Sequence, residues 1–167
     1  MGAKTLAPLE EYFRTSFDDY DREYVDGEIV ERDLPNSPHS EIHWRFCLIF
    51  GELSKTLPFH GRPELRTRVA ATRVRIADLS IYAGKKPAEL VPSTPPLVAI
   101  EILSPDDRPS KLLEKLEDCQ KWDVPHVWVV DPEKRELTVY RDGKRVKVGA
   151  YEIPEYNVKI PASEIFC

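Results

Sequence analysis

The sequence has few of the features that mark secreted, membrane-bound or thiolate-metal proteins. Its three cysteines are far apart and odd in number, which argues against a disulfide scaffold and against a Cys-x-x-Cys zinc site. No apolar run is long enough to cross a membrane. The segment Met1–Pro8 contains one lysine and no apolar stretch of signal-peptide length, so we expect a cytoplasmic protein with reduced thiols.

The sequence also lacks a surplus of positive charge. Its formal net charge is −5, which argues against binding nucleic acid through bulk electrostatics. A local basic face is compatible with this balance, because arginines cluster in one segment: Arg62, Arg66, Arg68, Arg73 and Arg75. These side chains fit two interpretations, the solvated faces of two strands or a surface that steers DNA.

Neither an internal repeat nor a low-complexity linker divides the chain. With 167 residues, of which 41% are hydrophobic, the protein can build one sizeable core. We therefore expect a single domain that covers residues 1–167.

The hydrophobic pattern predicts an α/β fold. Apolar residues at helical spacing follow Ser37 and Ser40, either of which could cap a helix that ends before Pro58. The other expected elements are a short helix over 9–15, an Asp-Gly hairpin over 24–31, strands over 66–70, 73–82 and within 96–105, a helix over 110–122, and strands over 127–130 and 136–140. The strand, helix and strand over 97–130 predict a right-handed crossover between parallel strands.

One carboxylate lies where a carboxylate is costly. The run Leu97–Leu103 is apolar except for Glu101 and ends at a Ser-Pro pair, which is typical of a short strand buried on both faces. An ionised side chain in such a strand takes up a proton or needs a partner. We therefore expect Glu101 to point into a wet cleft or to bind a cation.

A second acid, Asp78, lies near the middle of the strand expected over 73–82. If this strand pairs with that of Glu101, both carboxylates reach one point at the edge of the sheet. Oxygen ligands suit Mg²⁺ or Mn²⁺, and such a site can activate water against a phosphodiester. The alternative is structural: Asp78 caps a turn, and Glu101 forms a salt bridge with an arginine such as Arg75.

Several segments, taken in order, resemble the Uma family of putative restriction endonucleases. They are Y-V-D-G-E-I-V-E at 24–31, I-A-D-L-S-I-Y at 76–82, V-A-I-E-I-L-S-P at 98–105, Lys115, and V-P-H-V-W-V-V-D-P at 124–132. The resemblance covers nearly the whole chain. It implies the PD-(D/E)XK nuclease fold, a restriction-endonuclease-like mixed β-sheet core flanked by helices, in which paired acids hold Mg²⁺ for phosphodiester cleavage.

The resemblance assigns roles to the residues that match. Asp78 and Glu101, with the carbonyl oxygen of Ile102, would hold the metal ion. Lys115 matches the lysine that this family places on the following helix, where it would orient water and stabilise charge on the phosphate. Glu28 matches a further acid that would contact the metal or its water.

Some positions depart from the family. Ala77 stands in place of the proline that usually precedes the first acid, and Cys119 stands in place of a tyrosine. Leu103 occupies the lysine position of the wider superfamily, a change that the Uma family shares. Lys111, where relatives usually have aspartate, lies one helical turn before Lys115 on roughly the same face, so direction alone does not choose between the two lysines.

The histidines give no zinc site. His39 and His43 have a spacing that can bind zinc, but no H-E-x-x-H glutamate and no downstream ligand accompany them. His39 either lines the cleft or only begins the helix. We expect His60 and His126 to be structural.

These observations predict a metal-dependent DNA endonuclease that uses Mg²⁺, with Mn²⁺ as a substitute. The alternative is a non-catalytic relative that keeps the fold as a binding or assembly module. A homodimer is compatible with duplex cleavage, which needs two sites, although no self-complementary apolar stripe indicates one.

Overall fold

The computed structural model describes residues 6–167, and its centre is a mixed six-stranded sheet with the strand order β10-β9-β8-β7-β6-β3. Strands β7 and β8 are parallel and the other neighbours are antiparallel. The strands of this sheet are β3 (Phe59–Pro63), β6 (Leu79–Ala83), β7 (Val98–Ile102), β8 (His126–Asp131), β9 (Glu136–Arg141) and β10 (Lys144–Val148). The expected parallel pair over 97–130 is confirmed.

Helices cover both faces of this sheet. Alternate β7 residues point to opposite faces, so Val98 and Ile100 pack against helix α2 (Ser37–Leu53), while Ala99 packs against helix α3 (Pro109–Lys121). All five residues of β7 are buried, which confirms the two-sided burial predicted for this strand. Glu101 has the same parity as Ala99 and therefore lies on the face of α3.

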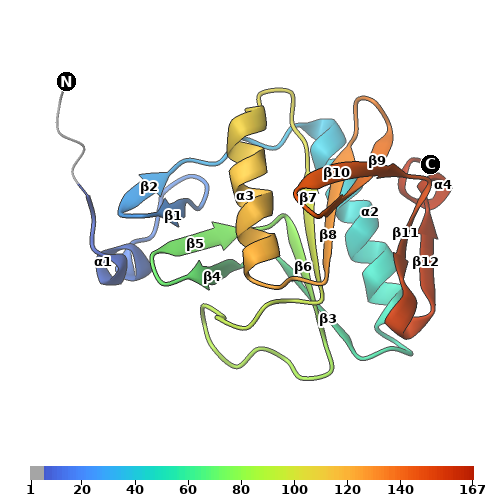
Figure 1. Cartoon of the computed structure of the whole chain (residues 1–167), viewed down its shortest axis with the longest axis horizontal. Helices are drawn as coiled ribbons and strands as arrows, with labels where there is room; N and C mark the ends of the chain where they lie inside the picture. Colours follow the sequence, from blue (N-terminus) through green and yellow to red (C-terminus); the bar gives the residue numbers. More distant parts are fainter. Residues whose placement is uncertain (1–5) are drawn as a thin grey trace.

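A smaller antiparallel sheet forms the N-terminal end of the molecule, with the order β2-β1-β5-β4 (Figure 1). Its strands are β1 (Glu23–Val25), β2 (Glu28–Val30), β4 (Arg66–Ala70) and β5 (Arg73–Ile76), and helix α1 (Leu9–Arg14) packs beside them. The predicted Asp-Gly hairpin is confirmed, because Asp26 and Gly27 both have positive φ angles between β1 and β2.

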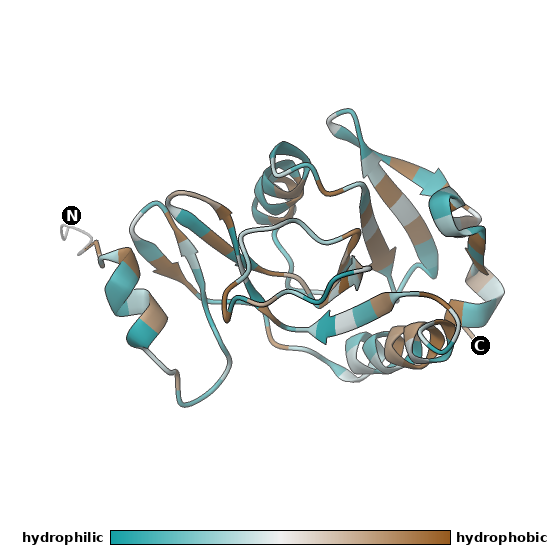
Figure 2. Ribbon diagram, turned by 90° about the horizontal axis from the view of Figure 1, so that it is seen from below, coloured by the Kyte–Doolittle hydropathy of each residue, from teal (hydrophilic) through white to brown (hydrophobic). Residues whose placement is uncertain are grey.

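The opposite end of the molecule is built by the C-terminal residues (Figure 1). It contains β11 (Ala150–Ile153), the 3₁₀ turn η1 (Pro154–Tyr156), β12 (Val158–Pro161) and helix α4 (Ala162–Ile165). Tyr151 stacks on Trp128 of the central sheet with ring centroids 4.3 Å apart. Figure 2 shows hydrophobic residues along the central strands, where this hairpin and α2 close the larger core.

The strand expected over 73–82 is interrupted, and this changes the position of Asp78. Strand β5 ends at Ile76 and β6 begins at Leu79, and the two belong to different sheets. The Asp78 carboxylate accepts the Ile102 N–H, in place of a backbone carbonyl that would continue the β6–β7 ladder. Asp78 therefore lies at the junction of two sheets and not in the middle of a strand.

Other boundaries also differ from the expectation. Asn36, not Ser37 or Ser40, caps α2, because its side chain accepts the N–H of His39. Strand β3 was not predicted, since Phe59–Pro63 includes glycine and proline and shows little alternation.

Within the described residues, no helix is both long and apolar enough to cross a membrane. Of the N-terminal segment considered for export, Met1–Thr5 lie outside the described range. All three cysteines are free thiols, as expected.

Candidate active site

A cleft of about 730 Å³ opens where the two sheets meet the first half of α3. Carboxylates outnumber lysine and arginine among its lining residues. The acidic ones are Glu23, Asp26, Glu28, Glu31, Asp33, Asp78, Glu101, Asp107 and Glu114, and the basic ones are Arg32, Arg75, Arg108, Lys111 and Lys115. The cleft therefore attracts cations, and it brings together every side chain that the sequence singled out as a site residue.

Asp78 is buried and held by three donors. Its Oδ2 accepts the Ile102 N–H at 2.7 Å, and its Oδ1 lies 3.2 Å from Nε2 of His39 and 3.5 Å from Nη2 of Arg32. Burial by itself would raise the pKa of Asp78, but the hydrogen bond and charge of His39 outweigh burial and hold the pKa below its usual value. Asp78 is thus ionised at neutral pH.

Glu101 is buried with only half of its carboxylate paired. Its Oε2 lies 3.0 Å from Nζ of Lys115, whereas Oε1 has no hydrogen-bond partner within the described part of the chain. Burial raises the pKa of Glu101 to about 8, because the charge of Lys115 offsets only part of the effect of burial and the negative charges of Asp78 and Glu23 raise the pKa further. The structural alternative of a Glu101–Arg75 salt bridge is wrong, because the partner is Lys115.

Lys115 lies at the centre of the acidic groups. Its Nζ donates to the Ile76 carbonyl at 2.6 Å and lies 2.9 Å from Oε1 of Glu23 and 3.0 Å from Oε2 of Glu101. Burial alone would lower the pKa of Lys115, but the two glutamates raise it above its usual value, so the ammonium stays charged. Lys115 is shared between two carboxylates, and Oε1 of Glu101 keeps no partner among the described residues, so this oxygen can contact a further cation.

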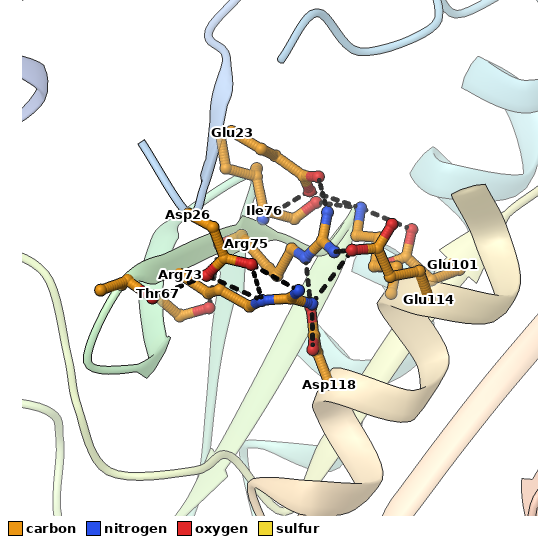
Figure 3. A network of polar contacts seen from close by, with 11 residues as sticks. Glu23, Asp26, Thr67, Arg73, Arg75, Ile76, Glu101, Glu114 and Asp118 are labelled. Atoms are coloured by element: carbon orange, nitrogen blue, oxygen red, sulfur yellow. Dashed lines mark hydrogen bonds and ion pairs between the residues drawn. The ribbon is translucent and has the colours of Figure 1, made fainter. Parts of the chain in front are cut away.

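Glu23 connects this centre to a buried ion-pair network (Figure 3). Its Oε2 lies 3.0 Å from Nη1 of Arg75, whose Nε donates to Asp118 of α3 at 2.7 Å. Asp118 also pairs with Arg73 at 2.9 Å. Burial would raise the pKa of Glu23, but the charges of Lys115 and Arg75 lower it below its usual value. The network fixes α3, and with it Lys115, against β1 and β5.

Two further predicted residues line the cleft. Glu28 lines the cleft at the start of β2, half-buried. Lys111 also lines the cleft but is exposed at the first turn of α3, so the structure separates two lysines that the sequence could not. Lys115 is more buried than Lys111, and it is Lys115 that contacts Glu101 directly.

Three members of the arginine cluster fit neither interpretation offered by the sequence. Arg75 is buried, and Arg73 and Arg66 pair with carboxylates, so these three are not free to solubilise an edge or to meet DNA. Their charge is used inside the protein, because each lies beside an aspartate from another element. Arg62 and Arg68 lie at the surface and hydrogen-bond to nearby backbone carbonyls.

The donor set suits a hard divalent cation. Two acids of the described cleft, Asp78 and Glu101, meet beside the Ile102 backbone, and Glu101 Oε1 is a buried oxygen without a partner. Among the described residues no group of three or more His, Cys, Asp or Glu is arranged to hold a metal ion. Mg²⁺ needs fewer protein ligands, since it is held by one or two carboxylates and keeps several waters. The residues present therefore fit Mg²⁺.

Three cleft residues gave little or no signal in the sequence. Glu23 was not singled out, because it precedes the Asp-Gly hairpin without any apolar run that makes its burial costly. Arg32 lies in a polar segment and gave no signal. His39 had two open roles, and the structure gives it both, since its N–H completes the helix cap and its ring contacts Asp78.

The comparisons with known proteins agree with this fold. The Uma2 family model, described as putative restriction endonuclease, matches residues 9–166. The chain is similar to the crystal structure of a putative nuclease of DUF820 from Anabaena variabilis, with 20% identity, a TM-score of 0.82, and coverage of 95% of this chain and 96% of that one. No curated protein matches. The restriction-endonuclease-like fold is thereby confirmed, and because the family model spans nearly the whole chain, the protein belongs to the Uma2 family of putative restriction endonucleases.

Proposed function

We propose that the protein is a Mg²⁺-dependent endonuclease that hydrolyses DNA phosphodiester bonds. The observation that carries this proposal is the half-paired, buried carboxylate of Glu101, whose free oxygen lies in a cleft beside Asp78 and Lys115. A structural acid would be fully paired, because an unsatisfied buried oxygen costs about 1–3 kcal/mol. Retaining it is consistent with a ligand that arrives from solution.

Asp78, Glu101 and the Ile102 carbonyl would hold Mg²⁺, with Mn²⁺ as a substitute. When bound, the ion supplies Lewis acidity and lowers the pKa of a coordinated water. Lys115 orients the attacking water and stabilises the negative charge that builds on the phosphate, since its ammonium is fixed by Glu23 and Ile76. Glu28, at the cleft wall, would contact the metal or its water.

A plasmid-nicking assay with and without Mn²⁺ tests this proposal. We expect the supercoiled plasmid to be relaxed or linearised only with the divalent ion, and Glu101→Gln to abolish cleavage. In thermal melts, Mn²⁺ should raise the melting temperature of the wild type and leave that of Glu101→Gln unchanged. An equal metal-induced shift in both proteins would remove Glu101 from the site.

The excess of carboxylates in the cleft favours a second candidate, a non-catalytic binding or assembly module, because it opposes a polyanion such as DNA. The same plasmid assay separates the two candidates. A module binds its partner without any metal-dependent nicking.

A homodimer would supply the two sites that duplex cleavage needs, and sedimentation of the protein with and without DNA tests its formation.

A further inference from the structure

Arg32 lies in the cleft on the segment between β2 and α2, and no role for it follows from the motifs. Its side chain is 14% exposed and its guanidinium bridges two carboxylates. Nη2 is 3.5 Å from Oδ1 of Asp78, and Nη1 is 3.4 Å from Oε1 of Glu64. Besides Lys115 and His39, Arg32 is therefore a basic residue of the described cleft that contacts a proposed metal ligand.

Lys115 and Arg32 are held very differently. Lys115 has contacts of 2.6, 2.9 and 3.0 Å with three partners, all within the buried network. Both contacts of Arg32 are longer, and one of its partners, Glu64, is 48% exposed, where ion pairs are weak. Asp78 does not depend on Arg32, because it also accepts from the Ile102 N–H and from His39. Arg32 can thus leave Asp78 without leaving a buried charge unpaired.

A divalent cation at Asp78 would change the balance of charge around Arg32. The cation and the guanidinium compete for the same carboxylate and, because both are positive, they repel each other. A guanidinium that is released into the cleft has planar paired donors, which match the oxygens of a phosphate. The substrate phosphate would supply the negative charge that Arg32 loses.

We propose that Arg32 is the counter-ion of Asp78 in the metal-free protein, and that metal binding releases it to bind the substrate phosphate. This inference rests on the proposed function, and it adds a residue that couples metal loading to DNA binding. Arg32 then belongs to the binding machinery, and Lys115 remains the fixed ammonium of the site.

The test uses the full-length wild type and the variants Arg32→Met and Arg32→Gln, with Arg22→Met as the matched control. Arg22 precedes β1, pairs with Asp19 and Glu31, and is 21% exposed, but it does not line the cleft. Metal affinity is read as the Mn²⁺ concentration that gives half of the rise in melting temperature. DNA affinity is read by fluorescence anisotropy of a labelled phosphorothioate duplex, which resists hydrolysis, in Mn²⁺ and in EDTA.

We expect both Arg32 variants to bind Mn²⁺ several-fold more tightly than the wild type, because the competing guanidinium is gone. Their DNA affinity should fall about tenfold in Mn²⁺, because one charge-assisted hydrogen bond to a phosphate is missing. In EDTA it should stay within about twofold, since Arg32 is then engaged by Asp78. Arg22→Met should change neither quantity.

An equal loss of DNA affinity with and without metal would show a mere steering charge and overturn the proposal, and so would unchanged or weaker Mn²⁺ binding in the two Arg32 variants. The metal-free melting curves establish that the variants are folded. If the wild type itself shows no rise in melting temperature with Mn²⁺ and no cleavage, the proposed function fails, and this inference fails with it. If the wild type responds to Mn²⁺ but the Arg32 variants do not show the expected changes in Mn²⁺ and DNA affinity, only the role of Arg32 is refuted.

Discussion

At the scale of single residues, the site is defined by an imbalance between carboxylates and the one ammonium among them. Glu23, Asp78 and Glu101 are all buried, and Lys115 contacts two of them. Asp78 and Glu23 keep a low pKa through close donors, whereas Glu101 does not. Glu101 is therefore the residue whose ionisation is costly without a cation.

This cost predicts a pH-dependent stability. The pKa of Glu101 is about 8 in the folded protein, above its ordinary value of 4.5, so the fold binds this proton more tightly than the unfolded chain. The contribution of Glu101 to stability is complete below pH 4.5 and declines as the pH rises to about 8. Metal-free Glu101→Gln should lack this decline.

Melts of the metal-free proteins between pH 5 and pH 8 test this expectation. The variant should match the wild type near the acidic end and melt higher near the basic end, by about 2–4 °C for each kcal/mol gained. Glu133→Gln, at an exposed position, is the control and should follow the wild type. A constant difference across the range would contradict the raised pKa.

Lys115, and not Lys111, should be needed for cleavage. Lys115 contacts Glu101, whereas Lys111 is exposed at the cleft edge. Lys115→Met should lower the cleavage rate by about 10²-fold or more with metal-induced stabilisation retained, because the ammonium acts on water and phosphate. With saturating plasmid, Lys111→Met should keep a cleavage rate within about twofold of the wild type, because an exposed lysine at the cleft edge affects DNA binding and not the chemical step. The reverse result would exchange the two lysines.

At the scale of elements, the site depends on the link between α3 and the N-terminal sheet. Asp118 of α3 pairs with Arg73 and Arg75 of β5, and Arg75 pairs with Glu23 of β1 (Figure 3). Because the chain leaves β5 at Ile76 and enters β6 at Leu79, Asp78 lies beside the end of β7. Helix α3, strands β1 and β5, and the junction between β5 and β6 are thus held together by buried charges.

Removing Asp118 should therefore destabilise the fold strongly. Asp118→Ala leaves Arg75 buried without its closest carboxylate, and breaking a buried pair from one side costs about 3–5 kcal/mol. Glu117→Ala, on the exposed side of the same helix, should cost less than about 0.5 kcal/mol. Urea unfolding curves measure both. A similar small cost for the two variants would show that the network adds little to stability.

At the scale of the whole molecule, an acidic protein that binds DNA needs accessible cations near its cleft. Arg66 is engaged by Asp21 and lies over the ring of Tyr12, 4.4 Å from its centroid. Arg108 and Lys111, at the start of α3, are exposed and line the cleft. The surface for DNA is therefore expected at the start of α3 and not along β4 and β5.

The salt dependence of DNA affinity tests this placement. Replacing Arg108 and Lys111 by glutamine should flatten the slope of log affinity against log salt by about 1 for each phosphate that the variant no longer neutralises. Arg66→Gln should leave the slope unchanged if that variant remains folded, as its melting curve will show. Fluorescence anisotropy at several salt concentrations gives the slopes. A flatter slope for Arg66→Gln alone would restore the arginine cluster as the DNA surface.

The sequence by itself determined the α/β order, the hairpin, the long helix, the parallel pair β7–β8 and the buried strand that carries Glu101. These follow from local signals: hydrophobic period, turn residues, and a charge in an apolar strand. The family resemblance extended them to the nuclease fold, which the comparisons confirm. The roles assigned to Asp78, Glu101, Ile102, Lys115 and Glu28 remain predictions that the variants above test.

Only the tertiary structure decided which charges meet. Glu23 and Lys115 are far apart in the sequence, and Arg75 pairs with Asp118 across a similar separation, so no local pattern reports either contact. Lys111 and Lys115 have nearly the same helical direction, and their different burial follows from how α3 docks on β5. Ion pairs are set by distances in space, whereas periodicity reports only which face of an element is apolar.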